Sequence, residues 1–295
     1  MEEIVRNVSG VVTPVLLCAL VGYGFALLKL PFDNKIVGSL VSNVGYPTLI
    51  LSHLTKQHVQ LAGFLDMMLA AAAAVACFGL AGLGILTALR LPIRGFLSPM
   101  MFNNVGNIGL PVCLLAFGNQ GLAYAMAFVV VVLAGIFTLG MWLPMRKVSL
   151  HKVLRQPVLY AVILAIVLMA TDTRLPATVE HTFNLLGGLA IPLMLLTLGH
   201  TLATLNIGLL RRGVALALLH LAVASATAFA LIRLFGFEGT ARGVLIVECV
   251  MPVSVATYLW IEMYDTEAAP SIASFILVST LLAVVVLPMV LTFWA

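Results

Sequence analysis

The most constraining feature of this sequence is a succession of apolar runs, each as long as a membrane-crossing helix. A helix needs about 20 apolar residues to span a bilayer, and that window gives about ten spans. The predicted spans lie near residues 9–30, 36–55, 61–89, 96–117, 120–143, 157–171, 180–204, 213–235, 241–263 and 270–294. Short connections separate them and leave no room for a soluble domain. The predicted fold class is therefore an all-α integral membrane protein.

The composition agrees with this prediction and excludes several kinds of function. Of the 295 residues, 62% are hydrophobic and 9% are charged, whereas soluble domains carry about 25% charged residues. The net charge of +4 is small, and no run of Lys and Arg indicates a nucleic-acid surface. Cys18, Cys77, Cys113 and Cys249 lie in apolar stretches without CxxC spacing, so we expect buried thiols.

Motifs for enzymatic chemistry are not found in the sequence. It contains no HExxH, GxSxG or phosphate-binding loop, and no His, Cys and Asp residues have metal-ligand spacing. We therefore expect no enzyme, no cofactor and no metal site.

The basic residues predict an orientation in the cell (inner) membrane. With the N-terminus outside, most of the 15 Lys and Arg residues fall in inside loops, as the positive-inside rule requires. Both termini are then non-cytoplasmic. The first ten residues carry two acids and no basic run, so we expect the first apolar run to be a retained span rather than a cleaved signal.

The stretch FNNVGNIGLP (102–111) is unusually polar for a membrane span. Pro111 lacks an N–H, so the carbonyl of Asn107 loses its helical partner, and Gly109 relaxes the backbone. Freed peptide groups are costly in lipid unless they line a cavity, and an interrupted helix presents half-helix ends that can bind an anion. We predict a break at 107–111. Three amides would serve its binding site: Asn103, Asn104 and Asn107.

A second break is predicted at CVMPVS (249–254), where Pro252 is preceded by Glu248 and followed by Ser254. A single proline usually indicates only a kink. Paired interruptions at matching positions of two halves instead point to the binding site of a transporter. Because each half has five spans, an odd number, any repeat must be inverted.

Glu248 is the main ionisable residue predicted inside the membrane. Acids at such depth are rare and commonly handle ions or protons, so Glu248 is the candidate for proton coupling. The alternative is that the span begins later and Glu248 lies at the outer headgroups beside Arg242. Asp66, at the start of the third span, is expected to be solvated near an interface. His53 and His200 could shuttle protons but are interpreted as hydrogen-bonded residues at span ends, and His220 is interpreted as structural.

The motifs together resemble the auxin efflux carrier family. Residues 104–111 resemble its NTxxxGxP stretch, and residues 251–288 resemble its last two spans. VGYPTLILSH (44–53) is similar to the second span and LMLLTLGHTLA (193–203) to the seventh, so the resemblance covers essentially the whole chain. Three features depart from the family pattern. They are the extra amides of the first break, Val105 in place of the family's common Thr, and Glu248.

The resemblance implies two inverted five-helix repeats, 1–147 and 148–295, whose fourth and ninth helices break and cross. Helices 1, 2, 6 and 7 would form a scaffold that supports a homodimer, while helices 3–5 and 8–10 move in an elevator-like way. The implied activity is secondary transport of small organic anions such as carboxylates. The implied contact and crossover residues are Asn104, Ser52, Gly109, Pro111 and Pro252, with Ser254 beside them.

Two alternatives stay open at this point. A sodium- or proton-coupled symporter or antiporter of the related bile-acid-symporter type shares crossed helices, but sodium coupling should require several clustered oxygen ligands. A passive channel or a receptor is the other alternative, and a channel should line one continuous pore with polar residues rather than concentrate them at two breaks.

Overall fold

The computed structural model describes residues 2–54, 60–145 and 155–293, and these residues are helical apart from their connections. The first part of the chain forms α1 (Glu2–Leu27), α2 (Asn34–Leu40), η1 (Val41–Gly45), α3 (Tyr46–Leu54), α4 (Leu61–Ala88), α5 (Ile93–Met101), η2 (Val105–Gly109), α6 (Leu110–Gly135), η3 (Ile136–Gly140) and α7 (Met141–Met145). The second part forms α9 (Pro157–Ala170), α10 (Ala177–Gly188), α11 (Ala190–Thr204), α12 (Leu210–Phe235), α13 (Gly239–Val250), α14 (Val255–Tyr264) and α15 (Ala269–Phe293). The three η segments are π-helical turns.

Six stretches of helix in the described residues are long and apolar enough to cross a membrane: Ser9–Leu27, Leu61–Ala88, Val105–Met145, Ala177–Thr204, Leu210–Phe235 and Ala269–Thr292. The longest of them turns at Gly118, whose φ of 64° lies in the left-handed region that glycine tolerates. That turn falls at a predicted connection between two spans. The prediction of an all-α membrane protein is confirmed.

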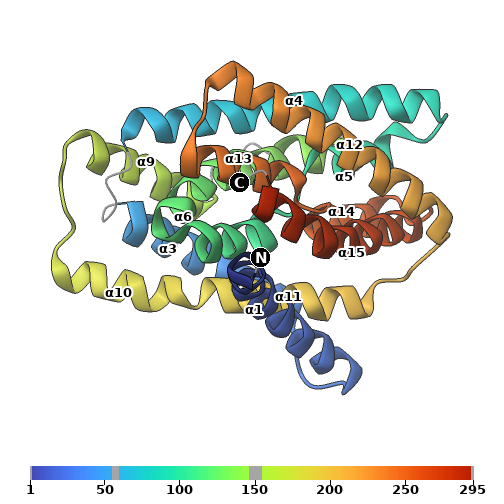
Figure 1. Cartoon of the computed structure of the whole chain (residues 1–295). Coiled ribbons are helices and arrows are strands. Elements are labelled where there is room, and N and C mark those ends of the chain that lie inside the picture. The colour runs from blue at the N-terminus through green and yellow to red at the C-terminus, as the bar shows by residue number, and fades with distance from the viewer. Residues whose placement is uncertain (1, 55–59, 146–154, 294–295) are drawn as a thin grey trace.

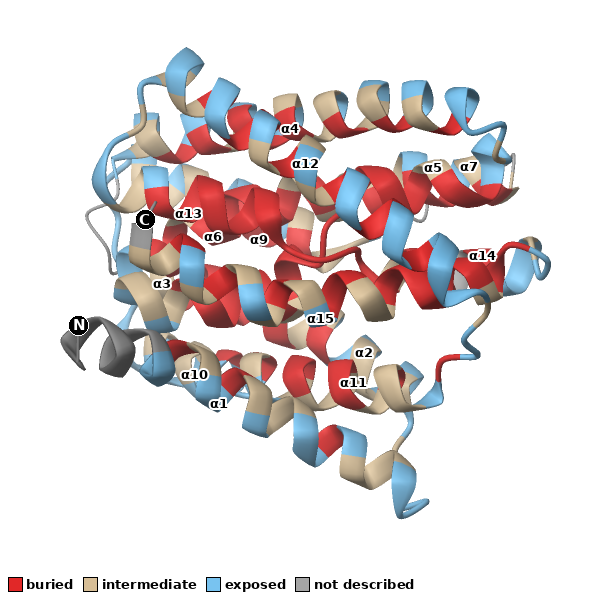
Figure 2. Cartoon of the chain, turned by 45° about the vertical axis from the view of Figure 1, so that its right-hand side comes forward, coloured by how far each residue is buried: buried red, intermediate tan, exposed pale blue. Residues whose placement is uncertain are grey.

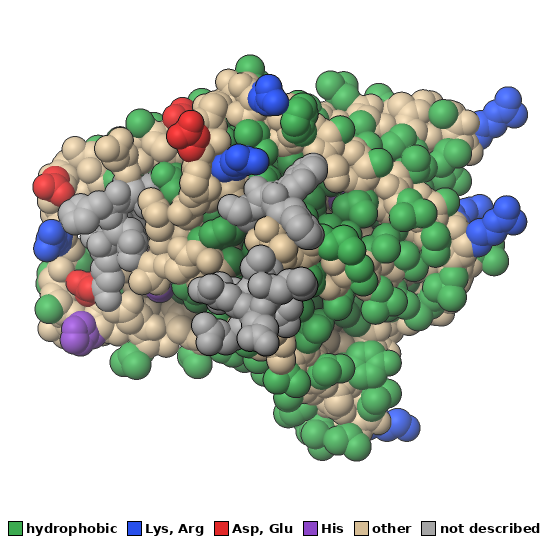
Figure 3. All heavy atoms as spheres, in the orientation of Figure 1, with side chains coloured by type: hydrophobic (Ala, Val, Ile, Leu, Met, Phe, Trp, Pro, Cys, Tyr) green, Lys and Arg blue, Asp and Glu red, His purple; other side chains and the backbone are tan. Residues whose placement is uncertain are grey.

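The helices lie in layers around a buried middle. In Figure 1, α4 and α12 run along one side, α1, α10 and α11 along the other, and α6, α13 and α15 lie between them. Figure 2 shows that buried residues concentrate in this middle layer. The outer helices expose large apolar side chains, such as Leu80 at 73% and Leu185 at 77%, and Figure 3 shows such side chains over much of one face. That surface suits a lipid solvent.

The first break lies earlier in the chain than predicted. Helix α5 ends at Met101, residues 102–104 lie outside any helix, and η2 and α6 then continue through residues 107–111. The prediction of a break at 107–111 is therefore wrong. Pro111 lies in the first turn of α6, where a missing N–H is tolerated, and the wide π turn before it already departs from regular helical pairing.

The second break lies where the sequence places it. Helix α13 ends at Val250 and α14 begins at Val255, with residues 251–254 outside both helices. Pro252 lies in this connection. Its ring and its missing N–H prevent α13 from continuing past Val250.

Candidate functional site

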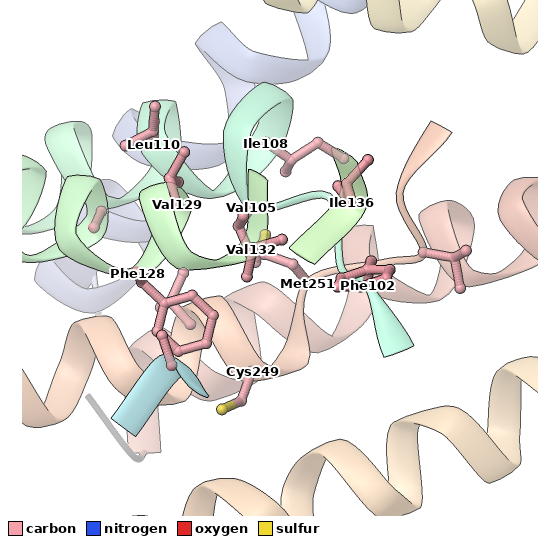
Figure 4. Close-up of a cluster of buried hydrophobic side chains, with 14 of the residues drawn as sticks. Phe102, Val105, Ile108, Leu110, Phe128, Val129, Val132, Ile136, Cys249 and Met251 are labelled. Atoms are coloured by element: carbon pink, nitrogen blue, oxygen red, sulfur yellow. The ribbon is translucent and has the colours of Figure 1, made fainter. Parts of the chain in front are cut away.

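The two breaks meet in the middle of the fold, although more than a hundred residues separate them in sequence. The N–H of Asn104 donates to the carbonyl of Pro252 at 2.6 Å, and the N–H of Ser254 donates to the carbonyl of Phe102 at 2.9 Å. Asn103 and Val253 thereby face each other in an isolated antiparallel bridge. Figure 4 shows Phe102 and Met251 within one buried apolar cluster at this meeting point. Each break satisfies peptide groups that the other frees, as a buried backbone requires.

The Asn103 side chain completes this pairing. Its amide nitrogen donates to the carbonyls of Cys249 at 2.6 Å and Glu248 at 3.2 Å. The Glu248 carbonyl is the one that loses its helical partner, because Pro252, four residues later, has no N–H. The Asn103 nitrogen is therefore engaged in holding the second break rather than open to a ligand.

Two polar atoms at the meeting point have no hydrogen-bond partner among the described residues. They are the amide oxygen of Asn103 and the amide nitrogen of Asn104, whose side chains are only 2% and 3% exposed. Buried polar atoms of this kind are costly without a partner, so each calls for an explanation. One acceptor and one donor thus remain available beside the paired breaks.

A cavity of about 490 Å³ lies against η2 and the start of α14, the helices that follow the two breaks. The break residues 102–104 and 251–254 are not among its described lining. Its amide and hydroxyl lining comes from several helices and includes Asn34, Ser39, Ser42, Asn43, Asn107, Thr197 and Thr201. Lys35 is the charged side chain among the lining residues, which include no carboxylate. Among the described residues, the lining therefore offers many neutral donors and one positive charge.

The second half of the broken ninth span also reaches this cavity. Val255 and Ala256, the first residues of α14, belong to its lining. The first N–H groups of a helix have no intrahelical partner and carry partial positive charge. This helix end therefore adds to the preference of the cavity for a negatively charged group.

Glu248 is fully buried behind η2 rather than at the surface. Its Oε1 accepts from the Cys113 thiol at 3.6 Å, and its Oε2 has no partner among the described residues. A Cβ built on Gly109 would collide with this carboxyl group, so the close approach requires glycine. This burial argues against the alternative in which Glu248 lies among headgroups beside Arg242.

The two serines predicted for the site occupy different places. Ser52 is buried in α3, where its hydroxyl contacts the carbonyl of Leu49 at 3.1 Å and the His53 ring at 3.0 Å. It is not among the residues that line the cavity. Ser254 lies within the second break and pairs through its main chain, whose carbonyl accepts from the Thr257 hydroxyl at 2.7 Å.

Sequence reasoning missed the residues that form the opposite wall of the cavity. Tyr46 lines it and lies so close to η2 that a Cβ on Gly106 would collide with its hydroxyl group. Thr201 also lines it and accepts a hydrogen bond from Asn34 at 3.2 Å. The polar side chains of the predicted span 36–55 were the available signal, but only the fold shows that they face Asn107.

Comparison with known proteins decides the family. A model of the family described as "Membrane transport protein" matches residues 141–291, just over half of the chain. The chain belongs to this family, that of the auxin efflux carriers. It is also 29% identical over 300 residues to an uncharacterized transporter of Methanocaldococcus jannaschii, an alignment that covers 94% of this chain and 96% of the relative. This auxin efflux carrier family member is thus a multi-pass membrane protein of a transporter family, as the resemblance of its motifs implied.

Proposed function

We propose that this protein is a secondary carrier that moves small organic anions, carboxylates in particular, across the cell membrane. The observation that carries the proposal is the pairing of two broken helices, together with a cavity against the helices that follow them whose described lining contains one lysine and no carboxylate. Paired interruptions of this kind are typical of transporter binding sites, and half-helix N-termini favour anions.

Substrate would enter the cavity and bind at its floor. Lys35 attracts the anion, while Asn107 and the first turn of α14 supply neutral donors and partial positive charge. Asn103, Asn104 and Ser254 are buried between the breaks and do not line the cavity, so they would reach the substrate only in a state of the cycle that opens the breaks. In that state the free amide nitrogen of Asn104 would donate to a carboxylate oxygen, and the Asn103 oxygen would accept from a donor on the substrate. In this proposal Ser52 contributes from the scaffold in another state of the cycle.

The moving parts would follow the two inverted repeats, 1–147 and 148–295, of ten membrane helices. Helices α1 to α3 and α9 to α11 form the scaffold, and α1 packs closely against α11. Helices α4 to α7 and α12 to α15 form the transport domain. Residues from both groups line the cavity, among them Tyr46 from the scaffold and Asn107 from the transport domain. Sliding at such an interface, with the breaks as the crossover, would give elevator-like alternating access.

The distribution of charge supports a cytoplasmic opening of the cavity. Figure 3 shows Lys and Arg side chains along one edge, the end at which α1 and α4 finish and α12 begins in Figure 1. The acidic turn around Asp265 lies at the same end, against Gly95, but acids contribute little to the positive-inside rule. By the positive-inside rule this edge is cytoplasmic and both termini are non-cytoplasmic. Lys35, in the same set of predicted inside loops, lies at the cavity.

A ligand screen tests the proposed function. Purified protein is heated with succinate, malate, acetate or indole-3-acetate, and with amines of matching size as controls. We expect at least one carboxylate to raise the melting temperature, since a ligand at 100 times its Kd stabilises a protein by about 2.7 kcal/mol. The same carboxylate should exchange across proteoliposomes that contain the protein. Stabilisation by the amines alone would contradict an anion carrier.

The buried Glu248 favours a proton-coupled form of this carrier. A carboxyl group without a charged partner inside the protein avoids the cost of a buried charge by holding a proton. Its position beside Gly109 and next to the carbonyls that Asn103 holds would link its proton to the arrangement of the breaks. A sodium-coupled carrier of the bile-acid-symporter type is the alternative to proton coupling.

A further inference from the structure

His220 lies in α12 with one ring nitrogen that packing does not explain. The side chain is 3% exposed, and its ring stacks on Phe78 of α4 at 5.6 Å and meets the edge of Phe275 of α15 at 5.7 Å. The Nε2 atom has no hydrogen-bond partner among the described residues. An aromatic hydrocarbon would fill the same space between the two phenylalanines. The polar atom therefore needs a reason of its own.

A small cavity of about 10 Å³ lies beside the His220 ring. It separates α12 from the second break and from α15, and its lining includes His220, Val250, Met251, Pro252 and Ser279. A buried water needs about 10–15 Å³ of such space and two to four polar partners. The cavity therefore has room for one water molecule.

The end of α13 has a main-chain carbonyl without its helical partner, at a residue that lines this cavity. In a continuous helix the N–H of Ser254 would bond to the carbonyl of Val250, but it donates to Phe102 instead at 2.9 Å. The preceding N–H of the break, that of Val253, donates to the Ser279 hydroxyl at 3.2 Å. The Val250 carbonyl thus loses its helical partner, and Val250 lines the cavity with His220.

We propose that His220 is a positioning residue for the second break. Its Nε2–H donates to one water in the small cavity, and this water donates to the main-chain carbonyl of Val250. The break is then held from two sides, by Asn103 on the side of the first break and by His220 and Ser279 behind it. Helices α4, α12 and α15 would in this way fix the segment that pairs with Asn104. The inference needs the fold alone and does not depend on the transported substrate.

Hydrogen exchange of the purified protein in lipid nanodiscs, without substrate, tests this role. His220→Phe keeps the aromatic stack and removes Nε2, so deuterium uptake by peptides covering 250–257 should become about tenfold faster, the loss expected for one hydrogen bond. His220→Gln keeps a donor and should stay within about twofold of wild type. His200→Phe is the matched control, because His200 stacks on Phe32 at 4.9 Å and does not line this cavity. It should leave the exchange unchanged.

The proposal is overturned if His220→Phe exchanges at the wild-type rate in these peptides, or if His220→Gln exchanges as fast as His220→Phe. A lower melting temperature of His220→Phe with unchanged exchange would show a packing role and also overturn it. If His220→Phe does not fold, a high-resolution structure of the wild-type protein decides the question. Density for a water within hydrogen-bond distance of Nε2 and the Val250 carbonyl supports the proposal, and a dry cavity rejects it.

Discussion

At the scale of single residues, two neighbouring asparagines have different tasks. The nitrogen of Asn103 holds the carbonyls of the second break, whereas the nitrogen of Asn104 has no partner in the described part of the chain. The sequence presents both simply as polar residues in a membrane span. The different roles of the two side chains depend on which of them faces Pro252. That orientation is known only from the pairing of the two breaks in the fold.

Asn104→Ala should weaken binding of the carboxylate found in the ligand screen. The loss of one contact to a charged group predicts roughly a tenfold increase in Kd, with little change in melting temperature because the nitrogen has no partner in the protein. Isothermal titration of both proteins measures it. Asn119→Ala, at an exposed position, is the control and should keep wild-type affinity. Unchanged affinity of Asn104→Ala would place the site elsewhere.

Gly109→Ala should destabilise the protein through the Glu248 side chain. The new Cβ would collide with the carboxyl group, and overpacking of this kind costs about 1–3 kcal/mol. Melting temperatures report the change. In a Glu248→Ala background the same substitution should be nearly neutral, because the colliding group is gone. Gly84→Ala, where an added Cβ meets nothing within 4 Å, serves as the control. An equal loss in both backgrounds would refute the contact.

Glu248→Gln should flatten the dependence of substrate affinity on pH. Under the proton-coupled proposal, acid protonates Glu248, whereas higher pH leaves a carboxylate that repels a nearby anion by roughly 1–4 kcal/mol. Wild-type affinity should therefore fall from pH 5 to pH 8, and the Gln variant should keep the acid affinity throughout. Glu238→Gln, at an exposed position, controls for surface charge. Parallel curves for the wild type and Glu248→Gln would exclude Glu248 from coupling.

At the scale of helices, hydropathy predicted the fold class better than the positions of single prolines predicted the breaks. The apolar runs predicted an all-helical membrane protein, because lipid forces a spanning backbone to satisfy its own hydrogen bonds. Pro252 marked the second break correctly, but Pro111 did not mark the first, since a proline in the first turn of a helix costs little. The cavity could not be predicted at all. Its lining joins segments as distant as Lys35 and Ala256, and only tertiary packing brings them together.

The two prolines should therefore differ when they are replaced. Pro252→Ala supplies an N–H that can compete with Asn103 for the Glu248 carbonyl and let α13 continue toward α14, so we expect transport to slow about tenfold, equivalent to about 1.4 kcal/mol. Pro111→Ala changes only the first turn of α6 and should retain most of the rate. Exchange of labelled substrate in proteoliposomes measures both. Equal loss in the two variants would contradict the location of the first break at residues 102–104.

At the scale of the whole molecule, the proposed orientation and the proposed cavity make one joint prediction. The N- and C-termini lie at the same end of the molecule, as Figure 2 shows, and are predicted to face the outside. Lys35, which belongs to a predicted inside loop, lines the cavity, so the cavity is expected to open to the cytoplasm. A cysteine placed at Ser39, on the cavity wall, should then react with a membrane-impermeant thiol reagent from the cytoplasmic side alone.

The experiment uses a background in which the four native cysteines are replaced, with labelling in right-side-out and inside-out vesicles. Bound carboxylate should slow the labelling of Ser39→Cys, because substrate fills the same cavity. Gly84→Cys, in a helical position outside the cavity lining, should show no such protection. If protection appears in neither variant, the cavity is not on the substrate path. Labelling of Ser39→Cys from the outer side alone, with protection by substrate, would support the cavity as the binding site. It would also show that the orientation derived from the basic residues is inverted.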